Sequence, residues 1–179
     1  MPRLRSNSSL RRSDKPTYNP LPSKINSTKI VQTFKSKDSD ITTVIKYPTS
    51  VIERNEFVNV KTGRRITPFQ YRVYDAVRQI PTGHVTSYKI LSDLLTSAPR
   101  AVGQALKVNP FCPLPVACHR IIATDKSIGG FSGGSGDSQL TANKKSKLEA
   151  EGCEFERDYI YKCNADGSTA FFSDFKIVQ

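Results

Sequence analysis

The sequence predicts a mainly α-helical domain organised around a helix-turn-helix, with a short β or extended segment before it and a disordered basic N-terminal tail. Three observations support this fold class: apolar residues recur at helical spacing after residue 67, turn signals separate three helices, and the first third is polar and basic. A chain of 179 residues has room for one domain with a core of ordinary size. We expect a tail at 1–40, the β or extended segment at 41–66, the helical domain at 67–158 and a C-terminal extension at 159–179.

The tail is rich in Ser, Thr, Asn, Pro, Lys and Arg, with few large apolar side chains to offset the entropy cost of ordering it. Residues 1–66 carry 14 Lys and Arg against 5 Asp and Glu, whereas residues 67–179 carry 13 against 11. Such a positive segment favours polyanions, of which nucleic acid is the commonest. The arginine clusters at 3–5 and 11–12 fit a solvated tail, a DNA-binding arm or nuclear address, or a mitochondrial presequence, and these three readings stay open.

The cysteines indicate the redox environment. Cys112, Cys118, Cys153 and Cys163 form no C-x-x-C pair, and no signal peptide precedes them. We therefore expect a reducing compartment and no disulfide framework. No apolar run approaches the ~20 residues needed to span a bilayer, so no membrane partner is expected.

Residues 41–83 are expected to form short β structure followed by the first helix. The β-prone runs 41–45 and 57–60, with a turn signal at 61–63, predict a small strand pair or extended segments laid on the domain. Thr67 suits the N-cap of a helix and Pro68 its first position. Apolar residues then recur at spacings of four, four and three, and the turn signal at 81–83 ends the helix: Phe69, Val73, Val77 and Ile80.

Two further helices complete the expected helix-turn-helix. Thr86 or Ser87 can cap a second helix that runs through Leu95. A turn at 96–99 follows, with Ser97 as the next cap, and a third helix extends to about residue 108. Two helices joined by a turn of this length form the supersecondary unit that many DNA-binding proteins use.

The third helix has one face with almost no side-chain bulk. Ala98, Ala101 and Ala105 fall at positions i, i+3 and i+7, and Gly103 lies close by. This pattern fits close helix packing against the core. It fits equally well a backbone that approaches nucleic acid closely, and the pattern alone does not choose between them.

A possible nucleophile follows at Cys118, beside the base His119 and the cation Arg120, with apolar residues on both sides. A cysteine attacks as the thiolate, and its ordinary pKa near ~8.5 means that a neighbouring base or positive charge must activate it. A cysteine in an apolar run is more often a small buried hydrophobe. Adjacent residues on an extended segment also point to opposite faces, so His119 can reach Cys118 only through a turn or a water molecule.

The chain beyond the cysteine contains a glycine-rich stretch at 129–134 without the Gly-Lys-Ser/Thr ending of a phosphate loop. A polar insertion at 135–142 precedes a charged helix at 144–150, and Gly152 is its expected stop. The C-terminal extension is a hairpin or a loose segment, to which the sequence assigns no role.

Six motifs stand in a fixed order across about half of the chain: Thr67-Pro68-Phe69-Gln70, Gly83-His84-Val85-Thr86-Ser87-Tyr88, Arg100-Ala101-Val102-Gly103-Gln104-Ala105-Leu106, Asn109-Pro110, Cys118-His119-Arg120-Ile121-Ile122, and Ile128-Gly129-Gly130-Phe131-Ser132-Gly133-Gly134. This order resembles the C-terminal catalytic domain of the O6-alkylguanine-DNA alkyltransferases, the methylated-DNA–protein-cysteine methyltransferases. Larger family members carry a full N-terminal α/β domain, so the resemblance implies a one-domain version with a winged-helix-like DNA-binding domain at 67–158.

The resemblance also implies a reaction. The protein would flip O6-alkylguanine, chiefly O6-methylguanine, out of duplex DNA and transfer the alkyl group irreversibly to Cys118, once per molecule. His119 would accept the thiol proton, and Glu151 would orient His119 through a chain that includes a water molecule. Tyr88 would donate a proton to N3 of the leaving base.

The remaining implied roles concern DNA, the base pocket and a hinge. Arg100 would fill the gap left by the flipped nucleotide. Ala98, Ala101 and Gly103 would contact DNA in the minor groove, which is only ~6 Å wide, and Thr67 would also bind DNA. Asn109 would act as a hinge between the helix-turn-helix and the active-site loop. The base would lie among four side chains: Tyr88, Phe131, Ser132 and Ile121.

The sequence departs from the family pattern near the nucleophile. Ala117 stands where the family usually has Pro, Pro115 lies two places earlier, and the interval from Asn109 to Cys118 is one residue longer. Phe131 replaces the usual Tyr and so keeps the stacking face without the hydroxyl. These changes predict a different loop path and leave the nucleophile in place.

The chemistry requires no cofactor and no metal, and the scattered cysteines offer no tetrahedral zinc set. We expect a monomer whose partner is double-stranded DNA containing O6-alkylguanine, located in the nucleus, with mitochondria or an undivided cytoplasm as alternatives. A non-catalytic alkyltransferase-like damage sensor is the alternative function, but such sensors lack the nucleophile that Cys118 provides. A Cys-His hydrolase is a third reading, and it leaves the helix-turn-helix unexplained.

Overall fold

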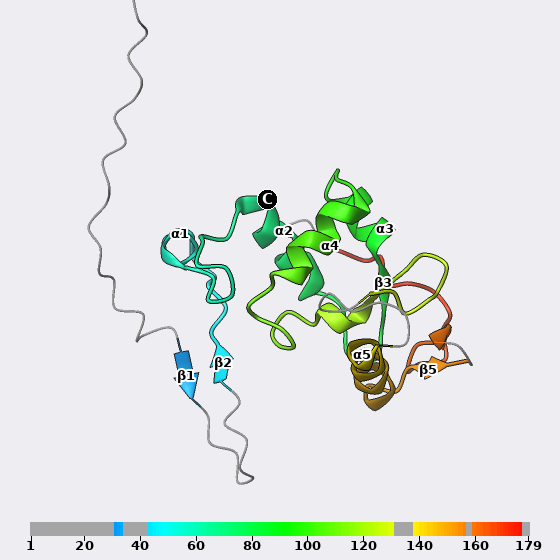
Figure 1. Cartoon of the computed structure of the whole chain (residues 1–179). Coiled ribbons are helices and arrows are strands. Elements are labelled where there is room, and N and C mark those ends of the chain that lie inside the picture. Colours follow the sequence, from blue (N-terminus) through cyan, green and yellow to red (C-terminus); the bar gives the residue numbers. More distant parts are fainter. Residues whose placement is uncertain (1–30, 34–42, 131–137, 157–158, 177–179) are drawn as a thin grey trace, which may run out of the picture.

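The computed structural model describes residues 31–33, 43–130, 138–156 and 159–176. Most of the described secondary structure is helical, as predicted, and the strands form short two-stranded pairs (Figure 1). In chain order the elements are β1 (Val31–Thr33), β2 (Thr43–Ile45), α1 (Val51–Glu56), α2 (Pro68–Val77), β3 (Thr86–Ser87), α3 (Tyr88–Leu94), α4 (Pro99–Lys107), a 3-10 helix (Cys118–Arg120), β4 (Ile121–Ile122), α5 (Gln139–Ala150), β5 (Glu154–Phe155) and β6 (Tyr161–Cys163).

The first helix of the domain begins where the sequence predicts. Thr67 Oγ1 accepts a hydrogen bond from Gln70 N, and the Gln70 side chain accepts one from Thr67 N, so the two form a capping box. The helix ends at Val77, three residues before Ile80, although Ile80 remains buried. One face of α2 is therefore committed to the core: Tyr71, Val73, Tyr74, Ala76 and Val77.

The next two helices are joined through residues 95–98, as expected. Ser87 caps α3 by accepting from Ile90 N, which confirms one of the two predicted caps. Ser97 was the wrong cap for α4, because the helix begins at Pro99 and its N-cap position falls on Ala98, which forms no side-chain cap. Tyr74 of α2 donates to Ala105 O at 2.9 Å and so fastens α4 across α2.

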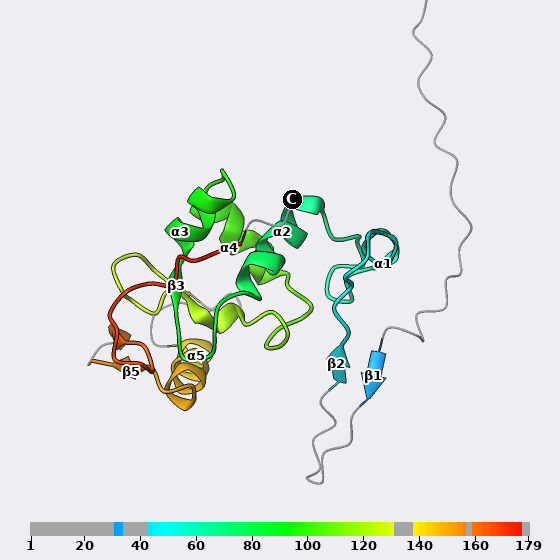
Figure 2. The ribbon, with the colours of Figure 1, turned by 180° about the vertical axis from the view of Figure 1, so that it is seen from behind.

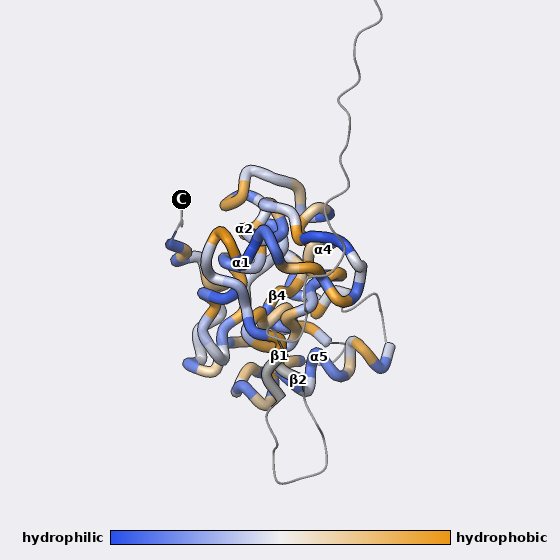
Figure 3. Tube along the Cα trace, turned by 90° about the vertical axis from the view of Figure 1, so that its left-hand side faces the viewer, coloured by the Kyte–Doolittle hydropathy of each residue, from blue (hydrophilic) through white to orange (hydrophobic). Residues whose placement is uncertain are grey.

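A short parallel strand pair connects the start of α3 to the segment after Cys118. Thr86 lies opposite Ile121, and Ser87 lies opposite Ile122, in the β3–β4 pair. Both isoleucines are fully buried, and Figure 3 shows β4 near the middle of the molecule. This pair places the start of α3, at Tyr88, directly after the strand that pairs with β4.

The segment at 45–66 packs on the domain core through aromatic rings. Tyr47 and Phe57 contact the ring of Phe111, with centroids 4.9 Å and 5.0 Å away. The expected turn at 61–63 is present, with a single bridge between Val58 and Arg65 around it. The segment therefore completes the core beneath the loop that leads to Cys118.

Two features of the N-terminal part differ from the prediction. Helix α1 was not expected, although its Ser50 and Glu53 form a capping box. The strand β1, at 31–33, lies within the segment predicted as a disordered tail and pairs with β2. The other residues of that tail lie outside the part of the chain that the structure describes.

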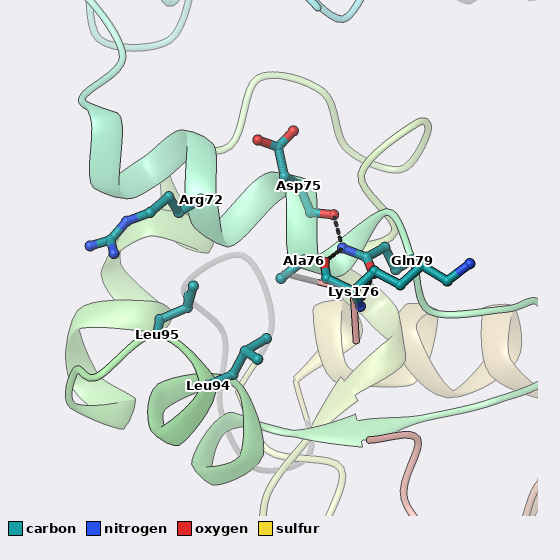
Figure 4. Close-up of a pocket in the computed structure, with 7 residues that line it drawn as sticks. All are labelled: Arg72, Asp75, Ala76, Gln79, Leu94, Leu95 and Lys176. Atoms are coloured by element: carbon teal, nitrogen blue, oxygen red, sulfur yellow. Dashed lines mark hydrogen bonds between the residues drawn. The ribbon is translucent and has the colours of Figure 1, made fainter. Parts of the chain in front are cut away.

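The C-terminal extension packs along the domain. Phe172 N donates to Val85 O, and Thr86 Oγ1 donates to Phe172 O, both at 2.8 Å. Further along, Gln79 exchanges two hydrogen bonds with the backbone of Lys176 (Figure 4). The segment thus passes β3 and ends beside α2, as its red trace shows in Figures 1 and 2.

Candidate active site

Cys118, His119 and Arg120 form one turn of 3-10 helix between the preceding loop and β4. The backbone N–H of Cys118 donates to Val116 O, and that of Arg120 donates to Ala117 O, which closes the turn. Cys118 is 7% exposed and His119 is 3% exposed. The turn that a Cys-His pair needs is therefore present, and it holds both side chains away from bulk water.

The imidazole of His119 is fixed by Glu151. His119 Nε2 lies 2.8 Å from Glu151 Oε1. Burial lowers the pKa of His119 below its ordinary value, and the hydrogen bond and charge of Glu151 offset only part of this effect. Because an ionised carboxylate only accepts, Nε2 carries the proton and the neutral ring presents a lone pair at Nδ1. Nδ1 is buried and has no hydrogen-bond partner among the described residues, so it is available as a base.

Glu151 accepts hydrogen bonds from two segments of the chain, the turn that contains His119 and Arg120 and the turn that contains Gly83. It sits at the C-cap of α5, where Gly152, with φ of 91°, ends the helix as predicted. Arg120 donates twice to the carboxylate at 2.8 Å, and Gly83 N donates at 3.3 Å. Burial alone would raise the pKa of Glu151, but hydrogen bonds from Arg120, His119 and Gly83 lower it to about 2. The carboxylate is therefore ionised at neutral pH and orients His119 directly.

The guanidinium of Arg120 does not serve as a cation beside the Cys118 thiol, as its position in the sequence suggested. It contacts Glu151 and also donates to Ile80 O and Thr82 Oγ1. The cation next to Cys118 in sequence thus binds Glu151 and the end of the α2 segment.

The sulfur atoms of Cys112 and Cys118 are joined in a disulfide. The expectation of no disulfide was wrong, because the loop folds back and brings the two Cα atoms to 6.3 Å although they are six residues apart. Cys153 and Cys163 are free and buried. Nucleophilic chemistry at Cys118 therefore requires that this disulfide be reduced.

The four residues predicted to line the base pocket differ in what the structure shows of them. Tyr88 Oη donates to Gly130 O at 3.3 Å, and burial raises the pKa of this phenol, which keeps its proton at neutral pH. Ile121 is fully buried, so its side chain presents no surface to a base. Phe131 and Ser132 lie outside the described residues.

The side chain of Asn109 hydrogen-bonds to the backbone of the loop that leads to Cys118. Its side-chain amide accepts from Phe111 N at 2.9 Å and donates to Val116 O at 3.4 Å, which ties together the two ends of the loop. The segment before α2 adds to this junction, because Lys61 Nζ donates to Asn109 O and Asn59 Nδ2 donates to Val108 O. The end of α4 and the start of the active-site loop are thus held from both sides.

Lys144 is a site residue that sequence reasoning missed. It is fully buried, and its Nζ donates to Ile121 O and Ile128 O, each at 2.6 Å. Burial lowers the pKa of Lys144 to about 7. The sequence shows only a charged helix, and nothing in that pattern separates this lysine from its exposed neighbours. Its contacts join β4 to the segment that leads into the glycine-rich stretch.

Replacing Lys144 tests this connection. Lys144→Met should lower the free energy of unfolding by about 1–3 kcal/mol, because two buried carbonyls lose their donor. The matched control is Lys147→Met, an exposed change on the same helix, which should stay within about 0.5 kcal/mol. Urea denaturation checks both values, and equal stabilities for the two variants would contradict the role of Lys144.

The predicted DNA-facing helix α4 divides into two surfaces. Ala105 is buried in the core, so close packing is the observed arrangement for that residue. Ala98 and Arg100 are exposed, and Ala101 and Gly103 are partly exposed. Thr67 is exposed while its side chain caps α2. A Cβ atom at Gly103 would meet nothing within 4 Å, so packing within the chain does not require glycine there.

A cavity of about 90 Å³ lies between α2 and the end of α3 (Figure 4). Its lining includes Gln79, Leu94, Leu95 and Lys176, and it contains none of the proposed catalytic residues. Within the described ranges no group of three or more His, Cys, Asp or Glu side chains is arranged to hold a metal ion. None of the described helices is long and apolar enough to cross a membrane.

Known proteins resemble this chain over the same region. Residues 68–153 match the family described as 6-O-methylguanine DNA methyltransferase, DNA binding domain. A curated methylated-DNA–protein-cysteine methyltransferase from Saccharolobus islandicus is 42% identical over 101 residues, which cover 56% of this chain and 59% of the relative. The protein of the same name from Sulfolobus acidocaldarius is 41% identical over 105 residues, which cover 59% of this chain and 60% of the relative.

Solved structures also match. S. pombe Atl1 in complex with damaged DNA containing O6-carboxymethylguanine is 31% identical, with a TM-score of 0.46, over 57% of this chain and 94% of that chain. The O6-methylguanine-DNA methyltransferase from Pyrococcus kodakaraensis strain KOD1 is 31% identical, with a TM-score of 0.43, over 63% of this chain and 69% of that chain. The present chain spans about 59% of the length of the first curated relatives.

Proposed function

This chain belongs to the O6-alkylguanine-DNA alkyltransferase family through residues 68–153, and from that premise we propose that it repairs DNA by moving an alkyl group from O6-alkylguanine to Cys118. It would act as a methylated-DNA–protein-cysteine S-methyltransferase that reacts once. The observation that supports the proposal most directly is the buried turn that places Cys118 next to a neutral His119. Nε2 of His119 is hydrogen-bonded to Glu151, which leaves Nδ1 to act as the base. The substrate is chiefly O6-methylguanine in double-stranded DNA.

The base must leave the helix before it can react, because the alkyl carbon of a stacked guanine cannot meet a protein sulfur in line. Unstacking costs a few kcal/mol, and less for a lesion that pairs badly. In this proposal α3 and α4 act as a helix-turn-helix of winged-helix-like type, with α4 in the minor groove and Arg100 in the vacated space. Support comes from the exposure of Arg100 and from the low bulk of Ala98, Ala101 and Gly103.

The transfer itself is a displacement at carbon. Nδ1 of His119 accepts the proton of the reduced Cys118 thiol, directly or through a water molecule. The thiolate then forms a bond to the alkyl carbon while the bond from that carbon to O6 breaks. Guanine leaves as the neutral base after Tyr88 donates a proton at N3, and His119 keeps the proton that the thiol lost. Phe131 and Ser132 would complete the pocket by stacking on the base and donating to O6.

A thioether has no easy route back to a thiol, so each molecule should react once. The test is a duplex with one methyl-labelled O6-methylguanine, incubated with the reduced protein. Label should move to protein one-for-one and should be absent from the Cys118→Ala variant. Repeated turnover would favour a hydrolase, and label that stays on tightly bound DNA would favour the damage sensor.

The partner and the location that we propose rest on the positive charge of the first third of the chain. Residues 1–66 hold most of the positive excess, which suits duplex DNA as the partner and the nucleus as the location. The protein would work as a monomer and without a cofactor.

Gly103 gives a prediction in which stability and DNA binding change in opposite directions. Gly103→Ala should raise the free energy of unfolding by about 0.5–1 kcal/mol, because alanine is the better helix former and the added Cβ meets open space. The same methyl group would stand between α4 and the floor of the minor groove, so affinity for duplex DNA should fall.

The matched control is Gln104→Ala, the next residue on the helix, which is exposed and has the same helical backbone. Thermal denaturation measures stability, and fluorescence anisotropy with a labelled duplex measures binding. Unchanged DNA affinity in Gly103→Ala would show that α4 does not approach DNA closely at this residue.

A further inference from the structure

We propose that Cys112 is a resolving cysteine, which closes a reversible disulfide on Cys118 and thereby makes alkyl acceptance depend on the thiol redox state. The functional part rests on the proposed role of Cys118 as alkyl acceptor. The pairing itself rests on the loop geometry alone.

The two cysteines belong to one loop and differ in exposure. They lie six residues apart with their Cα atoms at 6.3 Å. Cys118 is 7% exposed, whereas Cys112 is partly exposed and precedes Pro113 and Leu114, both on the surface. A soluble reductant can therefore reach the Cys112 side of the bond more easily than the Cys118 side.

The loop between them is fixed at both ends. The Asn109 side chain bonds the backbone of Phe111 and Val116, and Val116 N donates to Phe111 O at 3.3 Å. The Phe111 ring is held by Tyr47, Phe57 and Tyr74. Since these contacts do not involve either sulfur, the fold keeps Cys112 near Cys118 in the reduced protein as well.

Oxidation requires a hydroperoxide as the oxidant. The thiolate of Cys118 attacks the terminal OH oxygen of the hydroperoxide and the O–O bond breaks, which gives a sulfenic acid on Cys118. The alkoxide or hydroxide that leaves takes up the proton that the thiol had lost, and departs as alcohol or water. The thiolate of Cys112 then attacks that sulfur, the S–O bond breaks, and hydroxide leaves as water after gaining a proton. The sulfur of Cys118 is then held in a disulfide and cannot proceed to sulfinic acid, which is irreversible.

A dithiol reverses this state. Its thiolate attacks the sulfur of Cys112, and Cys118 leaves as a thiolate beside His119. The second thiol of the reductant then attacks the mixed disulfide and releases Cys112. A molecule that has already accepted an alkyl group carries a thioether at Cys118 and cannot enter the cycle. The disulfide therefore conserves only molecules that are still able to react.

The pairing can be measured without DNA. The full-length protein is first reduced, then treated with hydrogen peroxide, blocked with iodoacetamide and digested with trypsin. Cys112 and Cys118 lie between Lys107 and Arg120 and so fall in a single peptide. After peroxide that peptide should be two hydrogens lighter and carry no carbamidomethyl groups, and dithiothreitol should restore two modifiable thiols.

The functional test compares Cys112→Ser with Cys163→Ser, a buried cysteine on β6 that belongs to no pair. Both reduced variants should transfer alkyl groups as the wild type does. After peroxide, dithiothreitol should restore most transfer in the wild type and in Cys163→Ser, but little in Cys112→Ser, where Cys118 should appear as sulfinic acid.

Either of two results would overturn the proposal: two modifiable thiols in the peroxide-treated wild type, or equal recovery of Cys112→Ser and the wild type. If the linked peptide forms while the reduced protein accepts no alkyl group, the pairing stands and the proposed function fails. If the reduced protein accepts the alkyl group but the linked peptide never forms, the proposed function stands and the pairing fails.

Discussion

Glu151→Gln is expected to lower the free energy of unfolding by about 2–4 kcal/mol, because it removes one partner of a partly buried charge pair and leaves Arg120 uncompensated. The carboxylate accepts from His119, Arg120 and Gly83 N. A glutamine offers only one accepting oxygen, and its NH2 group must face another donor. The rate of alkyl transfer should fall by about 10²-fold or more, since His119 loses its fixed orientation as a base.

Glu149→Gln is the matched control. Glu149 lies two residues earlier, is exposed, and within the described part of the chain forms an ion pair with Lys145 at 3.4 Å. Its loss should cost no more than about 0.5 kcal/mol and leave transfer unchanged. Urea denaturation gives the free energy of unfolding, and single-turnover kinetics give the rate of alkyl transfer. Similar values for the two variants would show that Glu151 has no role in orienting His119.

The acid sensitivity of the wild type provides a second readout for the same carboxylate. The pKa of Glu151 is about 2 in the folded protein, against an ordinary value of 4.5. The unfolded chain therefore binds the proton first as the pH falls, so the stability that Glu151 provides is complete above about pH 4.5 and is lost as the pH falls toward 2. Glu151→Gln should lack this part of the pH dependence.

Gly83→Ala is expected to lower the free energy of unfolding by about 2–5 kcal/mol, from a positive φ together with a steric clash. Gly83 has φ of 75°, and a Cβ there would lie 2.5 Å from Ala165 Cβ and 2.9 Å from Glu151 O. Both atoms belong to rigid neighbours, so the backbone must move. The movement should also break the Gly83 contact with the Glu151 carboxylate and reduce alkyl transfer.

Gly167→Ala separates the two causes. Gly167 has φ of 78°, but a Cβ there would meet nothing within 4 Å. This control should therefore show only the backbone cost of about 1–2 kcal/mol and full transfer activity. Chemical denaturation of both variants measures the free energy of unfolding. Equal losses would mean that the close approach of Gly83 to Glu151 and Ala165 adds nothing to the backbone cost.

Local signals in the sequence were reliable where a single turn decides the structure. Thr67, Ser87 and Gly152 took their predicted places because a cap or a stop depends on neighbouring residues. Ser97 failed because α4 begins at Pro99, which places Ala98 at the N-cap position. Helix α1 could have been found, since Ser50 and Glu53 have the spacing of a capping box.

The site was only partly predictable, for a physical reason. Motif order pointed to Cys118 and His119, the resemblance added Glu151, and the structure brings His119 and Glu151 into contact. The burial of Lys144 and the pairing of Cys112 depend on how distant segments or a folded loop approach one another. Composition and periodicity contain no information on such approaches, so these two features required the structure.

The proposed repair reaction requires that the sulfur of Cys118 accept the alkyl group. Tandem mass spectrometry of the reduced protein, after incubation with an O6-methylguanine duplex, locates the added carbon to a single residue. We expect one methyl group on Cys118, in an amount equal to the lesion consumed. A methyl group on another side chain, or an unmodified protein alongside repaired DNA, would contradict the proposed reaction.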